Sequence, residues 1–159
     1  MNKDQLGLKA LLKPITVKYG IVGYSSNDFD KSQAQELLDN EFKEIVKRHP
    51  VASIEIVSGY TNLGIPKIAY ELADRYGFVM VGFSARQALS EDCGLYPVKK
   101  SIVRGEQYGD ESEAFISYID HLIRIGGGPQ SKREVLLFKQ MLDTGIKKGQ
   151  LIEHKVPQY

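Results

Sequence analysis

The sequence has few of the features that mark a specialised class of protein. It contains one cysteine, Cys93, no tryptophan and three histidines, and its 21 Lys and Arg residues nearly balance its 20 Asp and Glu residues. A lone cysteine cannot form an internal disulfide, and no CxxC pair or nearby histidine marks this one as reactive. We therefore expect a cytoplasmic protein in which Cys93 is an inert thiol and a hydrophobic core supplies the stability.

Long apolar segments are missing as well. The stretch from Tyr76 to Ala85 is only ten residues long, whereas a membrane-spanning helix needs about 20. The first residues, Met1 to Gln5, are polar and charged and lead into no long apolar region of a signal peptide. These absences predict a protein with no membrane partner.

Two further absences concern what the chain binds. A net charge of +1 argues against a nucleic-acid partner, because such binding depends on clustered Lys and Arg that neutralise several phosphates. The three histidines, His49, His121 and His154, lie far apart in the sequence and lack the spacing of paired metal ligands. We predict no metal site and no resident cofactor.

What the sequence does contain is an alternation of short apolar runs with amphipathic segments. The apolar runs predict strands at 18–23, 53–57, 78–83, 101–104, 121–125 and 151–156. Helical periodicity predicts helices that end at Pro50, at Gly77, near Ile119 and at Gly145, the third with Asp110 and Glu113 as its start signal. This order is typical of an α/β protein with a Rossmann-like, doubly wound, mostly parallel sheet and helices on both faces.

The length of 159 residues suits one domain. We expect a single domain over residues 1–159, of which 1–16 form an N-terminal extension. The segment 85–100 is a long connection that is either a lid over a site or a solvent-exposed connector.

Three loops rich in small residues follow predicted strands, where doubly wound sheets bind their ligands. Glycines there let backbone N–H groups approach a ligand, and a helix that follows adds unpaired N–H donors and a partial positive charge. The loops therefore favour anion binding, although glycine is also common at ordinary strand-to-helix turns. The candidate ligand-binding residues are Gly23, Ser25, Ser58, Gly59, Thr61, Asn62, Gly64, Gly126, Gly127, Gly128, Gln130 and Ser131.

Glu134 is the candidate catalytic residue, because it follows the last of these loops at the start of a predicted helix. Its carboxylate there is suited to general acid–base chemistry or to holding a ribose hydroxyl. The alternative is a capping box, Ser131-x-x-Glu134, in which the carboxylate only accepts a backbone N–H.

Two of these segments resemble the SLOG superfamily of Rossmann-like nucleotide-binding proteins. They are 58–66, Ser-Gly-Tyr-Thr-Asn-Leu-Gly-Ile-Pro, and the glycine run at 126–128. The superfamily includes the Lonely Guy (LOG) phosphoribohydrolases and the DprA proteins. LOG enzymes carry the motif P-G-G-x-G-T-x-x-E, onto which Gly127, Gly128, Ser131 and Glu134 map, while Gln130 stands at the third glycine.

The resemblance implies a nucleotide ligand and a homodimer, but the chain departs from the LOG pattern at one functional pair. The family's Arg-Lys pair falls near Glu111 and Ser112, within an acidic stretch at 106–113. A carboxylate there repels a monophosphate unless Arg104 or Arg124 compensates.

Three hypotheses follow from these patterns. The first is binding of a nucleotide or a nucleotide-derived phosphate at the glycine-rich loops. The second is LOG-like hydrolysis of the N-glycosidic bond of a nucleoside 5′-monophosphate, with Glu134 as the catalytic carboxylate. The third is a homodimeric structural or interaction module. Leu136 and Leu137 broaden the apolar surface of the last helix enough for an interface, although burial in a large core explains them equally well.

Overall fold

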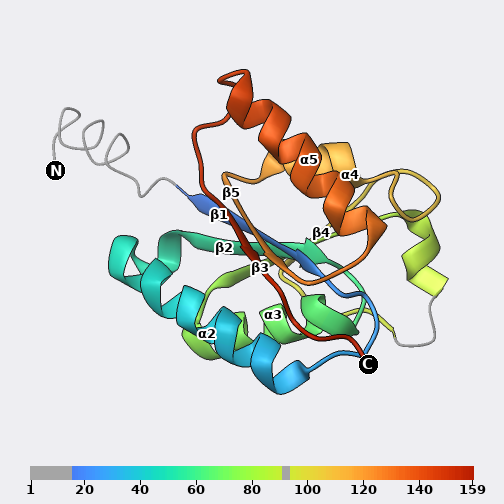
Figure 1. Ribbon diagram of the computed structural model, residues 1–159, viewed down its shortest axis with the longest axis horizontal. Helices are drawn as coiled ribbons and strands as arrows, with labels where there is room; N and C mark the ends of the chain where they lie inside the picture. The colour runs from blue at the N-terminus through green and yellow to red at the C-terminus, as the bar shows by residue number, and fades with distance from the viewer. Residues whose placement is uncertain (1–15, 91–93) are drawn as a thin grey trace, which may run out of the picture.

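The computed structural model describes residues 16–90 and 94–159, which form one six-stranded sheet with helices on both faces (Figure 1). All neighbouring strands are parallel, and their order is β4-β3-β2-β1-β5-β6. The strands are β1 (Val17–Gly23), β2 (Ile54–Gly59), β3 (Val79–Ser84), β4 (Lys100–Val103), β5 (His121–Ile125) and β6 (Leu151–His154). The predicted α/β, doubly wound fold class is confirmed.

Within the described residues, four α-helices connect the strands in two layers. They are α2 (Lys31–Arg48), α3 (Gly64–Tyr76), α4 (Ser112–Tyr118) and α5 (Pro129–Asp143). Figure 1 shows α2 and α3 on one face of the sheet and α4 and α5 on the other. Short 3₁₀ turns at Val51–Ser53 and Arg86–Ser90 complete the connections.

Each face of the sheet carries its own hydrophobic core, because side chains alternate along a strand. On β1, Tyr19 and Ile21 pack in the cluster beneath α2 and α3, where Phe42 is fully buried. Val22 points the other way into the cluster with Phe138. Both sides of the central strands are covered, which explains their continuous apolar sequences.

The helix boundaries follow local signals that the sequence shows in part. The Asp30 carboxylate caps α2 by accepting from the Gln33 N–H at 3.0 Å, and α3 ends at Gly77 with a left-handed φ of 80°. The predicted start of α4 at Asp110 is wrong, because α4 begins at Ser112. Asp110 instead closes the preceding turn by accepting from the backbone N–H groups of Glu106 and Gln107.

Two predicted segments lie wholly or partly outside the described residues. The extension at 1–16 falls there except for its last residue, and so does Cys93. The described part of the long connection after β3 is tied to the β2–α3 loop, since Asn62 N–H donates to the Gly94 carbonyl and Tyr96 N–H to that of Tyr60, each at 3.0 Å. None of the described residues in 85–100 lines the cavity considered below.

This strand order determines where a site can form. The strand β1 lies between β2 and β5, so the chain leaves it toward one edge of the sheet and later returns to its other side. The loops after β1 and β5 therefore separate at the carboxyl edge and leave a crevice, which is the usual ligand position in such sheets.

Candidate ligand-binding site

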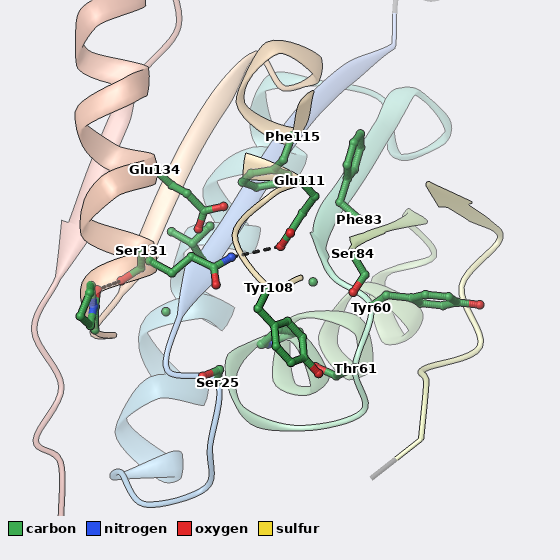
Figure 2. Close-up of a pocket in the computed structure, with 17 residues that line it drawn as sticks. Ser25, Tyr60, Thr61, Phe83, Ser84, Tyr108, Glu111, Phe115, Ser131 and Glu134 are labelled. Carbon is green, nitrogen blue, oxygen red and sulfur yellow. Dashed lines mark hydrogen bonds between the residues drawn. The ribbon is translucent and has the colours of Figure 1, made fainter. Parts of the chain in front are cut away.

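A cavity of about 210 Å³ opens at this carboxyl edge (Figure 2). Its walls come from the ends of β1, β2 and β3 and from the first turns of α3 and α5, with one side closed by the residues before and within α4. The cavity thus lies where the strand order reverses. Its 17 lining residues are Val22, Gly23, Ser25, Gly59, Tyr60, Thr61, Pro66, Phe83, Ser84, Tyr108, Glu111, Phe115, Gly128, Pro129, Gln130, Ser131 and Glu134.

Most of the predicted site residues meet at this cavity. Those that line it are Gly23, Ser25, Gly59, Thr61, Gly128, Gln130, Ser131 and Glu134. Those that do not are Ser58, Asn62, Gly64, Gly126 and Gly127. Three loops that are distant in the sequence therefore contribute to one space, as their positions after parallel strands led us to expect.

The predicted ligand contact of Ser58 is wrong. Its side chain is fully buried, and its hydroxyl donates to the Ile21 carbonyl at 2.6 Å inside the sheet. Gly64 also has a structural role, since a Cβ there would lie 2.4 Å from the Tyr24 carbonyl oxygen. The Asn62 Oδ1 is buried and has no hydrogen-bond partner among the residues that the structure describes.

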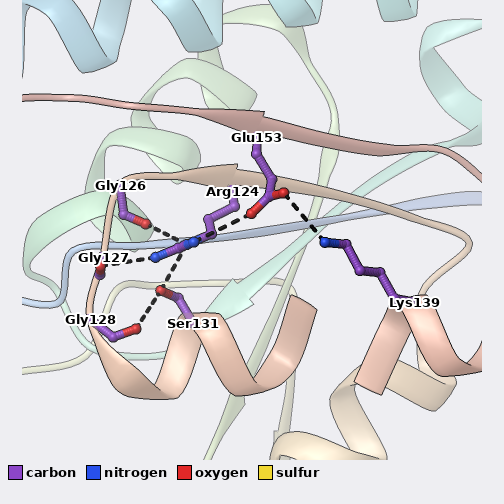
Figure 3. Close-up of polar contacts among 7 residues, drawn as sticks. All are labelled: Arg124, Gly126, Gly127, Gly128, Ser131, Lys139 and Glu153. Atoms are coloured by element: carbon purple, nitrogen blue, oxygen red, sulfur yellow. Dashed lines mark hydrogen bonds and ion pairs between the residues drawn. The ribbon is translucent and has the colours of Figure 1, made fainter. Parts of the chain in front are cut away.

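The glycine loop, Gly126–Gly128, is organised by Arg124 (Figure 3). The Arg124 Nε donates to the Gly126 carbonyl at 2.8 Å and its Nη2 to the Gly127 carbonyl at 3.0 Å. Its charge is balanced by Glu153, at 3.3 Å from Nη1. Arg124 does not line the cavity, so its guanidinium shapes the loop without facing the ligand space.

Ser131 belongs to the same network, which corrects its predicted role. The Ser131 hydroxyl donates to the Gly128 carbonyl at 3.0 Å and accepts from Arg124 Nε at 3.1 Å. A hydroxyl has one proton to donate. That proton is used within the loop, so Ser131 offers a ligand its backbone N–H rather than its side chain.

The first turn of α5 faces the cavity with no side-chain cap. The N-cap residue is Gly128, and Pro129 occupies the first helical position. The capping-box interpretation of Ser131 and Glu134 is therefore wrong, since both lie inside the helix. The backbone N–H groups of Gln130 and Ser131 in this first turn have no acceptor within the helix and carry its partial positive charge.

Glu134 and Glu111 form a buried pair of carboxylates on the cavity wall, with exposed fractions of 6% and 7%. The Ser112 hydroxyl donates to Glu134 Oε2 at 3.2 Å, and the Gln130 amide donates to Glu111 Oε1 at 3.1 Å. Burial raises the pKa of the Glu134 carboxyl to about 7, and the Glu111 charge adds to this rise. At neutral pH Glu134 is therefore able to give or take a proton.

Comparisons with known proteins identify the fold. No protein-family model and no curated protein matches the sequence. Among solved structures, the molybdenum cofactor carrier protein MCP of Chlamydomonas reinhardtii matches with a TM-score of 0.63 and 18% identity over 90% of this chain and 91% of that one. The molybdenum cofactor binding protein of Rippkaea orientalis matches with a TM-score of 0.59 and 17% identity over 90% of this chain and 78% of that one.

A third match is a structural-genomics target named TM1055, with a TM-score of 0.62 and 17% identity over 79% of this chain and 70% of that one. The chain shares a Rossmann-like α/β fold with these proteins. Identities at this level show the fold alone. The resemblance inferred from 58–66 and the glycine run is therefore confirmed as a resemblance of fold.

The sequence did not reveal the aromatic part of the cavity wall. Tyr60, Phe83, Tyr108 and Phe115 line it, with the Phe83 and Phe115 rings edge to face at 5.8 Å. Phe83 belongs to an apolar strand and Phe115 to an amphipathic helix, and the sequence gives no signal that their side chains reach the cavity. Glu111 was visible only as an acid where LOG enzymes have a base.

Two further findings concern the described residues as a set. In 16–90 and 94–159, His, Cys, Asp and Glu form no group of three or more that would suit a metal ion. No helix in these ranges has the length and apolar character to cross a membrane.

Proposed function

We propose that this protein binds a nucleotide or a nucleotide-derived phosphate in the cavity at the β1–β5 crevice. The observation that carries the proposal is the uncapped first turn of α5, which opens into the cavity at Gly128. A Cβ built on Gly128 meets no atom within 4 Å, so the space in front of these N–H groups is free. An anion placed there accepts from backbone donors along the axis of the helix.

The rest of the cavity suits the remainder of such a ligand. Glu134 lies four residues after Gln130, hence about 6 Å further along the helix axis. A sugar attached to the phosphate would reach the Glu134 carboxylate, and a planar ring beyond it would lie among Phe83, Phe115 and Tyr108. The Thr61 and Ser25 hydroxyls, also on the wall, provide further donors.

Calorimetry with a panel of nucleoside monophosphates, NAD fragments and cyclic nucleotides tests this proposal. The molybdenum cofactor, which names two of the structural neighbours, belongs in the panel as a separate arm. We expect at least one phosphorylated ligand to bind and its dephosphorylated form to bind more weakly. Equal binding of the two forms would refute the phosphate position.

A second candidate function is hydrolysis of the N-glycosidic bond of a nucleoside 5′-monophosphate. Its support is Glu134, which is buried on the cavity wall and has a pKa raised to about 7. Base release from nucleoside monophosphates should then be detectable by chromatography and abolished in Glu134→Gln. Undiminished release in this variant would assign the activity to another residue.

The resemblance implies that the protein forms a homodimer. We propose that α5 provides the dimer interface. Leu136 is 58% exposed, while Leu137 is partly buried against the core. We expect light scattering to show a dimer and Leu136→Glu to produce a monomer. A monomeric wild-type protein would remove this proposal.

A further inference from the structure

The polar side chains of the cavity wall are rich in acceptors and poor in positive charge. Among the described residues that line it, the ionisable groups other than tyrosines are Glu111 and Glu134, and no Lys, Arg or His is present. The phosphate position at α5 offers backbone N–H groups, whereas the remaining cavity wall carries two carboxylates. Whatever lies there must supply hydrogen-bond donors.

Glu111 is held in a fixed orientation at this point. It is the N-cap residue of α4, yet its side chain makes no capping hydrogen bond and lines the cavity instead. The Gly109 N–H donates to its Oε2 at 3.0 Å. The Gln130 amide donates to its Oε1 at 3.1 Å (Figure 2). Each carboxylate oxygen has a second lone pair, so both oxygens keep the capacity to accept from a ligand.

Two acceptor oxygens on one carboxylate match two donors that are adjacent on a ring. The edge of guanine, a 2-amino-4-oxopyrimidine, presents a ring N–H beside an exocyclic amino group. Hypoxanthine keeps the ring N–H but lacks the amino group. Adenine places a lone pair on the equivalent ring nitrogen, which a carboxylate repels.

We propose that Glu111 is a specificity residue that selects a ligand with the 2-amino-4-oxopyrimidine edge of guanine, in the cavity between Phe83, Phe115 and Tyr108. This inference rests on the proposed function for the position of the phosphate, but the ring contact makes its own prediction. Gln130 contributes by holding Glu111 from the start of α5, next to the phosphate position.

The test is calorimetry on the full chain with GMP, IMP and AMP, and with guanosine and inosine as phosphate-free probes. A hydrogen bond to a charged group corresponds to roughly a 10- to 100-fold change in affinity. We expect GMP to bind tighter than IMP by about this factor, AMP to bind weakest, and guanosine to be preferred over inosine by the same ratio. Equal affinities for GMP and IMP would overturn the ring assignment while leaving the phosphate site intact.

Glu111→Gln should bring the affinity for GMP close to that for IMP, because one acceptor of the pair becomes a donor. Glu113→Gln, which removes the same charge from an exposed position on the first turn of α4, should leave the ratio unchanged. Glu111→Asp provides a second variant. It keeps the negative charge, but its shorter side chain places the carboxylate farther from the ring, so the preference for GMP over IMP should also be lost. If Glu111→Gln weakened GMP and IMP binding equally, Glu111 would be structural only and the inference would be wrong.

If GMP and guanosine bound equally well and both were preferred over their inosine counterparts, the ring contact would hold and the phosphate position would fail. If none of the five probes bound, both proposals would be refuted for these rings.

Discussion

Gly128 allows the phosphate position to be tested without damage to the fold. Its backbone, with φ −103° and ψ −151°, is extended and open to any residue, and a Cβ there would touch nothing within 4 Å. Aspartate is among the best N-cap residues, so Gly128→Asp should cap α5 and raise the free energy of unfolding by a few tenths to about 1 kcal/mol. The same carboxylate would lie next to the position that we assign to the ligand's phosphate.

The expected loss of binding follows from Coulomb's law. Two unit charges about 5 Å apart interact by roughly 1–3 kcal/mol at effective dielectric constants between those of water and a protein surface. Against a phosphate, Gly128→Asp should therefore weaken binding by roughly 5- to 150-fold, and the loss should shrink as salt is added.

Gly128→Asn is the matched control, because asparagine has the same shape and also caps a helix but carries no charge. Calorimetry at low and at high salt gives the affinity, and urea unfolding gives the free energy of unfolding, for the wild type, Gly128→Asp and Gly128→Asn. The reasoning is refuted if the Asp and Asn variants bind equally, or if the Asp variant binds as tightly as the wild type. A less stable Asp variant would show that the helix start is built differently.

Three other predictions concern stability. Gly127→Ala should lower the free energy of unfolding in urea by roughly 2 kcal/mol or more, because φ is 101° and the new Cβ would lie 2.4 Å from Ser131 Oγ; an unchanged midpoint would contradict this. Because the pKa of Glu134 is raised in the folded protein, its ionisation between about pH 5 and 7 destabilises the wild type. Glu134→Gln cannot ionise, so its free energy of unfolding should exceed that of the wild type increasingly over this range. Urea titrations at pH 8 should show a difference of roughly 2–3 kcal/mol. Burial lowers the pKa of His121, whose Nδ1 accepts from the Gln150 N–H at 2.9 Å. The free energy of unfolding should therefore decrease as the pH is lowered below about 6.5. His121→Asn keeps an acceptor but does not titrate, so its free energy of unfolding should depend less on pH.

The sheet and most of its helices could be predicted from the sequence because their signals are local. Continuous apolar runs such as 78–83 identify buried parallel strands, and Pro50 and Gly77 mark helix ends. The start of α4 was misplaced because Asp110 had two ways to accept backbone N–H groups, by capping a helix or by closing a turn. In the structure the Asp110 carboxylate accepts from backbone N–H groups of the turn at 106–110 and does not cap the helix.

The site was only partly predictable, because a side chain's role depends on which partner is nearest in the fold. The sequence identified Ser58 and Ser131 as hydroxyls beside glycines, but not the Ile21 and Gly128 carbonyls that accept their protons. It identified Arg124 as a possible counter-charge, but the guanidinium is directed at the loop carbonyls behind the cavity. Glu134 was recognised by its spacing, whereas its burial and its Glu111 neighbour required the structure.

The position of β1 in the middle of the sheet has a consequence for how the protein comes to function during synthesis. Gly23 and Ser25 leave the ribosome early, but Gly128 and Glu134 follow more than a hundred residues later. The hydrogen bond from the Tyr24 hydroxyl to the Val156 carbonyl can form only after Val156 has also been made. The strands β1 to β4 can pair with one another before β5 is made. The cavity cannot form until β5 has paired with β1 and α5 has packed on the sheet. The cavity that we assign to the ligand therefore becomes complete only after α5 has been made and has packed on the sheet.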